Sequence, residues 1–260
     1  MGLDVRAEIE GIARRFRAEG DAGRAAAERA YLKSELKFHG VGMPGVRAAA
    51  KELLARHPGV TRQELRALVD AAYRTDFHDL RSAAIAVMEK RVRLLEKADL
   101  PWLIELVRVS ANWAHVDWLA VKMVGPVVGS DAKELARWAK DAPSFWVRRT
   151  ALLAQLDELR GGRGDFQLFA RIAAPMLGEK ELFIRKAIGW VLREVSKKRP
   201  ELVFDFLKAH EGEPSGLTFR EASKYLPPAM QKTLKGAGRA GSPSAPDPEG
   251  GPPPPRRPGR

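Results

Sequence analysis

The chain has 260 residues and a formal net charge of +12, with 45 lysines and arginines against 33 acidic residues. It contains no cysteine, which excludes disulfide scaffolds, thiolate metal sites and cysteine nucleophiles. No uncharged run approaches the roughly 18 residues that a membrane span requires. We therefore expect a cytoplasmic protein whose basic surface meets a polyanion, most often nucleic acid. A solvated basic surface without a partner is the alternative.

Helical periodicity runs along most of the chain. Apolar residues recur at spacings of three and four positions, and Ala, Leu, Arg, Glu and Lys dominate these stretches. Segments rich in glycine and proline separate them. The predicted helices span 46–54, 80–92, 113–127, 145–156 and 183–195. No convincing alternating pattern predicts a strand, so we expect an all-α protein.

The predicted helices recur at a nearly constant interval. Aligning the charged residue near the start of each one gives successive separations of 34, 36, 32, 37 and 35 residues. This period fits a helix pair with two turns, as in TPR, ankyrin and HEAT arrays, and the TPR and ankyrin signatures are missing. We expect a HEAT-like helical repeat solenoid, a right-curved α–α superhelix with a concave basic face, although any all-α chain shows a loose beat of this length. The aligned positions are Arg47, Arg81, Asp117, Arg149, Lys186 and Glu221.

The last 25 residues differ in composition from the rest. Between Pro243 and Pro258 there are eight prolines, and the only hydrophobic residues after position 235 are three alanines. Such a segment cannot bury enough surface to offset its ordering entropy. We predict one folded domain over 1–235 and a disordered tail rich in Pro, Gly and Arg over 236–260.

The aligned residues form a stripe along the concave face if the register is right. Its four cations, at positions 47, 81, 149 and 186, suit the phosphate backbone of DNA. Asp117 interrupts them, which indicates either chemistry on a cationic centre or a salt bridge to Arg149 or Arg81. Glu221 also breaks the stripe, without a mechanistic reason.

Two tryptophans lie one helical turn from this stripe. Trp113 precedes Asp117 by four residues, and Trp190 follows Lys186 by four. A tryptophan beside a carboxylate on a wet face can hold a cation or a flat base. For the other four tryptophans we predict ordinary packing in the core: Trp102, Trp118, Trp138 and Trp146.

Other motifs predict no chemistry. Residues 40–45 match G-x-G-x-x-G, but no strand precedes them and Pro44 interrupts them. We interpret them as a loop leading into the helix at position 46, whose free amides could hold a phosphate. The five histidines lack metal-ligand spacing, so no metal and no cofactor is expected.

Four segments resemble the AlkD-like DNA alkylation repair family, DNA glycosylases built of HEAT-like repeats. They are YLKSELKFHGV at 31–41 with Pro44 and Arg47, NWAHVD at 112–117, FWVRRTA at 145–151 and FIRKAIGWVLRE at 183–194. The resemblance covers about residues 25–225. Any one segment is modest evidence, but four in the same order are strong.

The resemblance assigns a role to individual residues. Asp117 is similar to the family's catalytic carboxylate, and Trp113 and Trp190 are similar to the aromatics beside the lesion. Arg149 resembles an arginine near the DNA backbone, and Tyr31 a residue of the same cleft. With Arg47, Arg81 and Lys186 these complete the predicted site.

The implied activity is that of a monofunctional DNA glycosylase in base excision repair, a hydrolase that removes 3-methyladenine and 7-methylguanine from double-stranded DNA. We expect a monomer associated with the nucleoid, without strand cleavage, because no lysine near Asp117 is indicated as a Schiff-base nucleophile. Two alternatives are a non-catalytic DNA-binding HEAT protein and a protein-binding HEAT scaffold.

Overall fold

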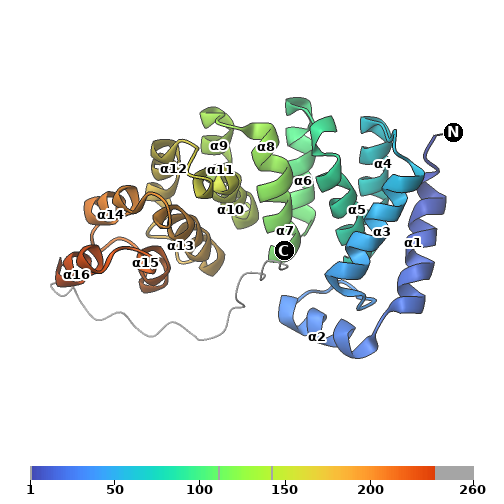
Figure 1. The fold of residues 1–260 in the computed structure, drawn as a ribbon, viewed down its shortest axis with the longest axis horizontal. Coiled ribbons are helices and arrows are strands. Elements are labelled where there is room, and N and C mark those ends of the chain that lie inside the picture. Colours follow the sequence, from blue (N-terminus) through green and yellow to red (C-terminus); the bar gives the residue numbers. More distant parts are fainter. Residues whose placement is uncertain (1, 111, 142, 238–260) are drawn as a thin grey trace.

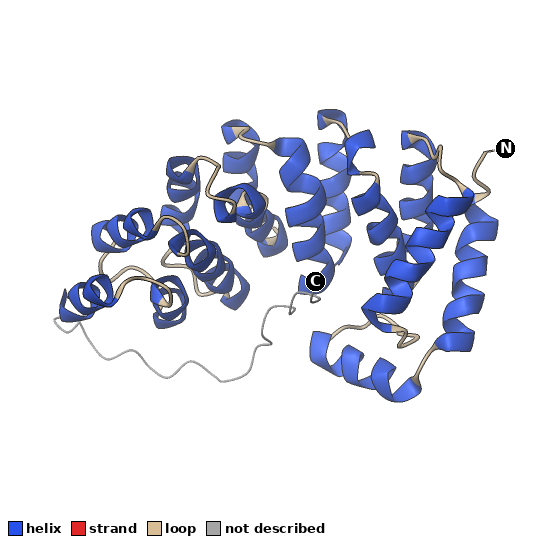
Figure 2. Cartoon of the chain, in the orientation of Figure 1, coloured by secondary structure: helices blue, strands red, loops and turns tan. Residues whose placement is uncertain are grey.

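Helices joined by turns form the whole described part of the chain (Figure 2). The computed structural model describes residues 2–110, 112–141 and 143–237. In these ranges no strand occurs, and the one bridge of strand type pairs Lys37 with Phe77. The all-α prediction is confirmed. Most of the predicted tail, 238–260, lies outside the described residues, and none of the described helices is long and apolar enough to cross a membrane.

The helices form two layers that curve around an open side (Figure 1). The outer layer holds α1 (Val5–Glu19), α4 (Arg62–Tyr73), α6 (Leu100–Ser110), α9 (Ala132–Ala139), α12 (Phe166–Ala173) and α14 (Pro200–Ala209). The inner layer holds α3 (Gly42–Arg56), α5 (His78–Lys90), α7 (Trp113–Leu119), α10 (Phe145–Leu153), α13 (Leu182–Ser196) and α15 (Gly216–Ser223). Neighbouring inner helices contact one another in chain order, which makes the chain a helical repeat protein.

Shorter elements connect or end the layers. Near the N-terminus α2 (Ala22–Leu32) lies apart from the two layers, at the open side of the array (Figure 1). The remaining elements are η1 (Val92–Leu94), η2 (Lys97–Asp99), η3 (Ala120–Val124), α8 (Gly125–Val128), α11 (Leu156–Arg160), η4 (Ala174–Met176) and α16 (Pro228–Ala237).

The predicted repeat register agrees with the layers. All six aligned charged positions, from Arg47 to Glu221, fall on inner helices, one per helix. The small residue Gly189 lets two of these helices approach closely, because a Cβ atom there would lie 2.8 Å from the Cβ atom of Glu221. Each inner helix thus carries one of the six aligned positions.

Several predicted helix bounds are wrong, among them the end of the helix predicted over 145–156, since α10 ends at Leu153. Helix α3 begins at Gly42 rather than at position 46, because Pro44 falls in its first turn, where a missing N–H costs no hydrogen bond. The helix predicted over 113–127 is divided, since η3 is a π-helical turn between α7 and α8. A π turn holds one more residue than an α turn, which simple periodicity does not reveal.

One continuous apolar core lies between the layers. Phe16, Leu53, Leu119 and Phe169 are among its fully buried members. Four tryptophans are predicted to pack in the core. Of these, Trp138 is fully buried, at 2 % exposed. The other three are half-buried against the core: Trp102, Trp118 and Trp146.

Ion pairs join successive repeats near the surface. Lys122 donates to Asp157 at 2.7 Å, and Arg148 donates to Glu179 at 3.0 Å. The two members of each pair lie about one repeat apart in the sequence. Arg62–Glu96 and Arg108–Asp141 follow the same pattern. Such pairs fix the register of neighbouring repeats. They add little to the free energy of unfolding, since exposed ion pairs contribute little.

Candidate active site on the concave face

The short helix α7 carries the central residues of the predicted site. Its N-terminus is capped by Asn112, whose side-chain oxygen accepts the backbone N–H of His115 at 3.1 Å. Trp113 and Asp117 follow at a spacing of four, which places them on one face of the helix. His115 lies between them on the opposite, buried face, at 1 % exposed.

Asp117 is held by a single arginine of the next repeat. Nε and Nη2 of Arg149 donate to the two carboxylate oxygens at 2.7 and 2.8 Å. This two-pronged pair fixes the plane of the carboxylate as well as its position. Of the two sequence alternatives for a salt bridge, the partner is Arg149 and not Arg81. The Asp117 side chain remains 16 % exposed.

Arg149 is buried between three inner helices. Its side chain is 5 % exposed, and its Nη1 donates to the carbonyl oxygen of Phe183 at the start of α13. Its guanidinium carbon also lies 5.8 Å from the centre of the Phe183 ring. A side chain so enclosed has little reach toward a DNA phosphate. The guanidinium of Arg149 is engaged by Asp117 and by Phe183, and its expected DNA contact stays a prediction.

Tyr31 and Trp113 meet edge to face at the site. Their ring centres lie 5.7 Å apart with an angle of 75° between the planes, a favourable aromatic geometry. Tyr31 comes from the end of α2 and is 48 % exposed. Residues 82 positions apart in the sequence thus form one aromatic wall beside Asp117.

Two further predicted site residues, Lys186 and Trp190, lie on α13. Trp190 is half-buried and packs partly against the core. Lys186 lies one turn before it, and burial lowers the pKa of its ammonium, as does the nearby charge of Arg149, while Glu221 opposes both. Glu221 itself pairs with Arg193 of α13, which supplies the reason for this acid that the sequence did not.

Arg47 and Arg81 differ in what their charges face. Arg47 is exposed, with its guanidinium carbon 5.9 Å from the centre of the Trp118 ring. Arg81 is half-buried and donates from Nε and Nη2 to the carbonyl of Thr75 at 3.1 and 2.8 Å. Burial lowers the pKa of Arg81. Arg47 is thus the better placed of the two for a phosphate, and both DNA contacts stay predictions.

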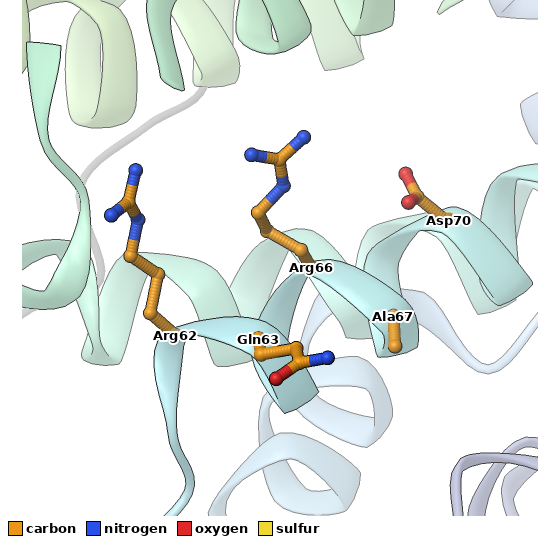
Figure 3. Close-up of a pocket in the computed structure, with 5 residues that line it drawn as sticks. All are labelled: Arg62, Gln63, Arg66, Ala67 and Asp70. Carbon is orange, nitrogen blue, oxygen red and sulfur yellow. The ribbon is translucent and has the colours of Figure 1, made fainter. Parts of the chain in front are cut away.

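A shallow depression lies elsewhere, on α4 of the outer layer (Figure 3). It has a volume of about 590 Å³ and is lined by Arg62, Gln63, Arg66, Ala67 and Asp70. None of the predicted site residues lines it. Its two arginines are already engaged by Asp99, and together with the lining residue Asp70 the charges cancel, which leaves no net positive charge to attract an anion.

Sequence reasoning missed three residues that shape the site. They are Asn112, which caps α7, Phe183, whose carbonyl holds Arg149, and Ser82, which hydrogen-bonds His115 at 2.9 Å. Asn112 follows the ordinary N-cap preference and could have been found from that signal. The other two act through long-range contacts that no local pattern reveals.

In the part of the chain that the structure describes, no group of three or more His, Asp or Glu side chains could hold a metal ion. The inner helices carry a partly exposed carboxylate, Asp117, the cations Arg47 and Lys186, and Trp113, which Tyr31 of α2 contacts. The fold defines a class, the all-α helical repeat proteins, and these charged and aromatic residues of the inner helices are its candidate site.

Comparisons with known proteins identify the family. The model of the family described as DNA alkylation repair enzyme matches residues 12–226, and the chain belongs to this family. No curated protein matches the chain significantly. A predicted DNA alkylation repair enzyme from Enterococcus faecalis is 30 % identical with a TM-score of 0.71, covering 81 % of this chain and 98 % of that one.

Two further solved structures share the fold. The protein smu.31 from Streptococcus mutans UA159 is 19 % identical, with a TM-score of 0.57, and covers 85 % of this chain and 100 % of its own. AlkD2 from Streptococcus mutans is 22 % identical, with a TM-score of 0.55, and covers 78 % of this chain and 97 % of its own. The resemblance inferred from the sequence is confirmed, and a DNA repair role follows from the family.

Proposed function

We propose that this protein is a monofunctional DNA glycosylase that hydrolyses the N-glycosidic bond of cationic alkylated purines, such as 3-methyladenine and 7-methylguanine, in double-stranded DNA. One observation carries the proposal. A partly exposed carboxylate, Asp117, is fixed by two hydrogen bonds from Arg149 on the same helix face as Trp113.

The positive charge of the substrate explains why one carboxylate is enough. When the bond from C1′ to the alkylated base breaks, its electron pair passes to the base, which leaves neutral. No general acid is needed, whereas sugar hydrolases usually require a second carboxyl group for that task. Positive charge builds on the deoxyribose as an oxocarbenium ion. Water then adds to C1′ and gives up a proton.

Asp117 is the group suited to stabilise that charge. A carboxylate whose orientation is already fixed need not reorganise as the charge develops, and such preorganised groups make large contributions to rate. Arg149 supplies the orientation from beneath, and the exposed part of the carboxylate faces the ligand. Asp117 can also orient the attacking water.

The aromatic wall accounts for selectivity. Trp113 with Tyr31 on one side and Trp190 on another offer faces that attract a cationic nucleotide more than a neutral one. Many glycosylases flip the base into a deep pocket. The depression on α4 is lined by none of these residues, and we assign recognition to the open face of the inner helices.

The direct test is base release. Purified protein is incubated with duplex DNA methylated at purine nitrogens, and free 3-methyladenine and 7-methylguanine are quantified by mass spectrometry. Release by the wild-type protein supports the proposal. Salt-sensitive DNA binding without release would instead indicate a non-catalytic DNA-binding protein, and weak DNA binding even at low salt would indicate a protein scaffold.

A second experiment tests the monofunctional part. Borohydride reduction during turnover would trap a Schiff base between C1′ of the sugar and a lysine. We expect no trapped adduct, despite the lowered pKa of Lys186, because water is the proposed nucleophile. An adduct that disappears in Lys186→Ala would show that this lysine attacks the sugar.

A further inference from the structure

A column of three stacked rings lies behind the site. The rings of Phe38 and His78 are 4.5 Å apart, and those of His78 and His115 are 4.1 Å apart, with planes within 17° and 13° of parallel. The three residues come from the loop after α2, from α5 and from α7. The column therefore links the segment that carries Tyr31 to the helix that carries Trp113 and Asp117.

Hydrogen bonds fix the state of His115. The Asn112 amide is oriented by two contacts: its oxygen accepts the His115 backbone N–H at 3.1 Å, and its nitrogen donates to the carbonyl of Ser110 at 2.8 Å. The same nitrogen lies 3.3 Å from Nδ1 of His115. Since an amide nitrogen only donates, Nδ1 accepts. The ring proton is then on Nε2, which donates to Oγ of Ser82 at 2.9 Å.

This geometry requires a neutral ring at position 115. A proton on Nδ1 would face the N–H of Asn112, and the amide would have to turn and give up its cap on α7. Burial, followed by the charges of His78 and Arg81, lowers the pKa of His115 well below its usual range. Burial and Arg81 also lower the pKa of His78, to about 4. The ring at 115 is thus an uncharged connector between α5 and α7.

The other end of the column is tied as firmly. The backbone N–H of Lys37 donates to the backbone carbonyl of Asp76 at 2.8 Å, and the backbone N–H of His78 donates to the backbone carbonyl of Lys37 at 2.9 Å. Phe38 therefore enters the column from a segment pinned to the start of α5. Tyr31, six residues before Lys37, sits at the end of that segment's helix and meets Trp113 at 5.7 Å.

We infer that His115 is a positioning residue of the active site, and that the Phe38–His78–His115 column sets the spacing between Tyr31, Trp113 and Asp117. The predicted effect on the rate of base release rests on the proposed function. The predicted effect of His115 on the structure of α7 does not depend on that function. His115 touches no reacting atom. It acts through the cap of α7 and the contact with Ser82.

The main test replaces His115 by Phe. This variant keeps a flat ring in the column and removes both side-chain hydrogen bonds. We expect the single-turnover rate of base release to fall, by up to about 100-fold if the site residues shift by an ångström. Affinity for alkylated duplex should change less than twofold, because the concave cations are untouched.

A double variant and a matched control separate positioning from loss of stability. Ser82→Ala removes the same hydrogen bond from the other side, so the double variant should be no slower than the slower single variant. Leu207→Ala in α14 empties a buried site of the core, at 2 % exposed, far along the array from α7. It should lower the melting temperature without changing the release rate of folded protein.

A readout without activity completes the experiment. Hydrogen exchange at the backbone amides of positions 115 and 116 should be faster in His115→Phe than in the wild type, because the N-cap of α7 is weakened. Wild-type release rates in that variant, or a fall no larger than in Leu207→Ala, would overturn the inference. If the wild-type protein released no base, only the proposed function would be overturned. Unchanged hydrogen exchange at the two amides would even then overturn the positioning role of His115.

Discussion

Asp99 and Asp117 are both carboxylates that join one repeat to the next, but they do so in different layers. Asp99 ends η2 beside the outer helix α4, and its side chain is fully buried. It accepts from Nε of Arg62 at 2.9 Å, from Nη1 of Arg66 at 3.0 Å and from the backbone N–H of Glu96 at 2.9 Å. Figure 3 shows the two arginines on α4.

Asp117 uses the same device with one arginine fewer. Arg149 occupies one edge of the carboxylate, and the side chain keeps 16 % of its surface exposed. A fully buried carboxylate that already accepts three hydrogen bonds has no surface left for a ligand and can only hold the fold together. A carboxylate that accepts hydrogen bonds along one edge only, as Asp117 does from Arg149, is equally well oriented and can still accept a hydrogen bond from a ligand. The difference in partners separates a structural acid from a candidate catalytic one.

The largest effect is expected at the structural acid. Asp99→Ala removes three hydrogen bonds to a buried carboxylate, each worth about 1.5–3 kcal/mol before the partly exposed arginines regain water, and should reduce the free energy of unfolding by about 3–5 kcal/mol. Denaturant unfolding followed by circular dichroism measures this loss. Base release per folded molecule should stay at the wild-type level, and a fall in that specific rate would contradict the division of roles.

The next effect is expected at the candidate catalytic acid. Asp117→Asn keeps the shape but removes the charge, and base release should fall about 10²–10³-fold, as for removal of a preorganised electrostatic partner. Duplex affinity, measured by fluorescence anisotropy, should be retained. Release at the wild-type rate would remove Asp117 from the mechanism.

A smaller effect is expected at the residue beneath it. Arg149→Lys keeps the positive charge but cannot form the two-pronged pair or reach Phe183 with the same geometry. Loss of one hydrogen bond to a charged group is worth about 1.5 kcal/mol, so release should slow about tenfold. Rates equal to those of Asp117→Asn would mean that Arg149 does more than orient the carboxylate.

The smallest effect concerns acid pH. Burial would raise the pKa of Asp99, but the hydrogen bond from Arg62, the Glu96 amide and the two arginine charges outweigh it and hold the pKa below its usual value. The stabilisation is therefore complete above the unfolded pKa and is lost as pH falls through the folded one. The difference in unfolding free energy between the wild type and Asp99→Asn should be constant above pH about 4 and should shrink below it. A difference that persists at lower pH would contradict the assigned pKa direction.

Much of the fold was predictable from local patterns. Helix formers and apolar periodicity predicted the inner helices, and the spacing of charged residues predicted which positions share the concave side. The pairing of Trp113 with Asp117 on one face follows from a spacing of four. These features depend only on residues within one or two turns, or on a repeat that the sequence itself displays.

The rest depended on packing between repeats. Sequence spacing allowed a salt bridge from Asp117 to either Arg149 or Arg81, and only the stacking of α7 on α10 selects Arg149. The contact between Tyr31 and Trp113 requires the position of α2, which lies outside the repeat pattern. The buried state of His115 depends on Ser82 and on a ring stacked from α5, neither of which is near it in the sequence.

The π-helical turn η3, directly after α7, has a consequence for how this site could be gained or lost. Each residue of a helix advances it by about 100°. Five residues of a π-helical turn cover about the same rotation as four residues of an α-helix, so deleting a single residue within 120–124 would restore ordinary pitch and leave the indole of Trp113 and the carboxylate of Asp117 facing nearly the same way relative to α8. The π turn can therefore absorb the loss of one codon without turning the site, whereas a deletion between Trp113 and Asp117 would rotate these two side chains by about 100° relative to one another.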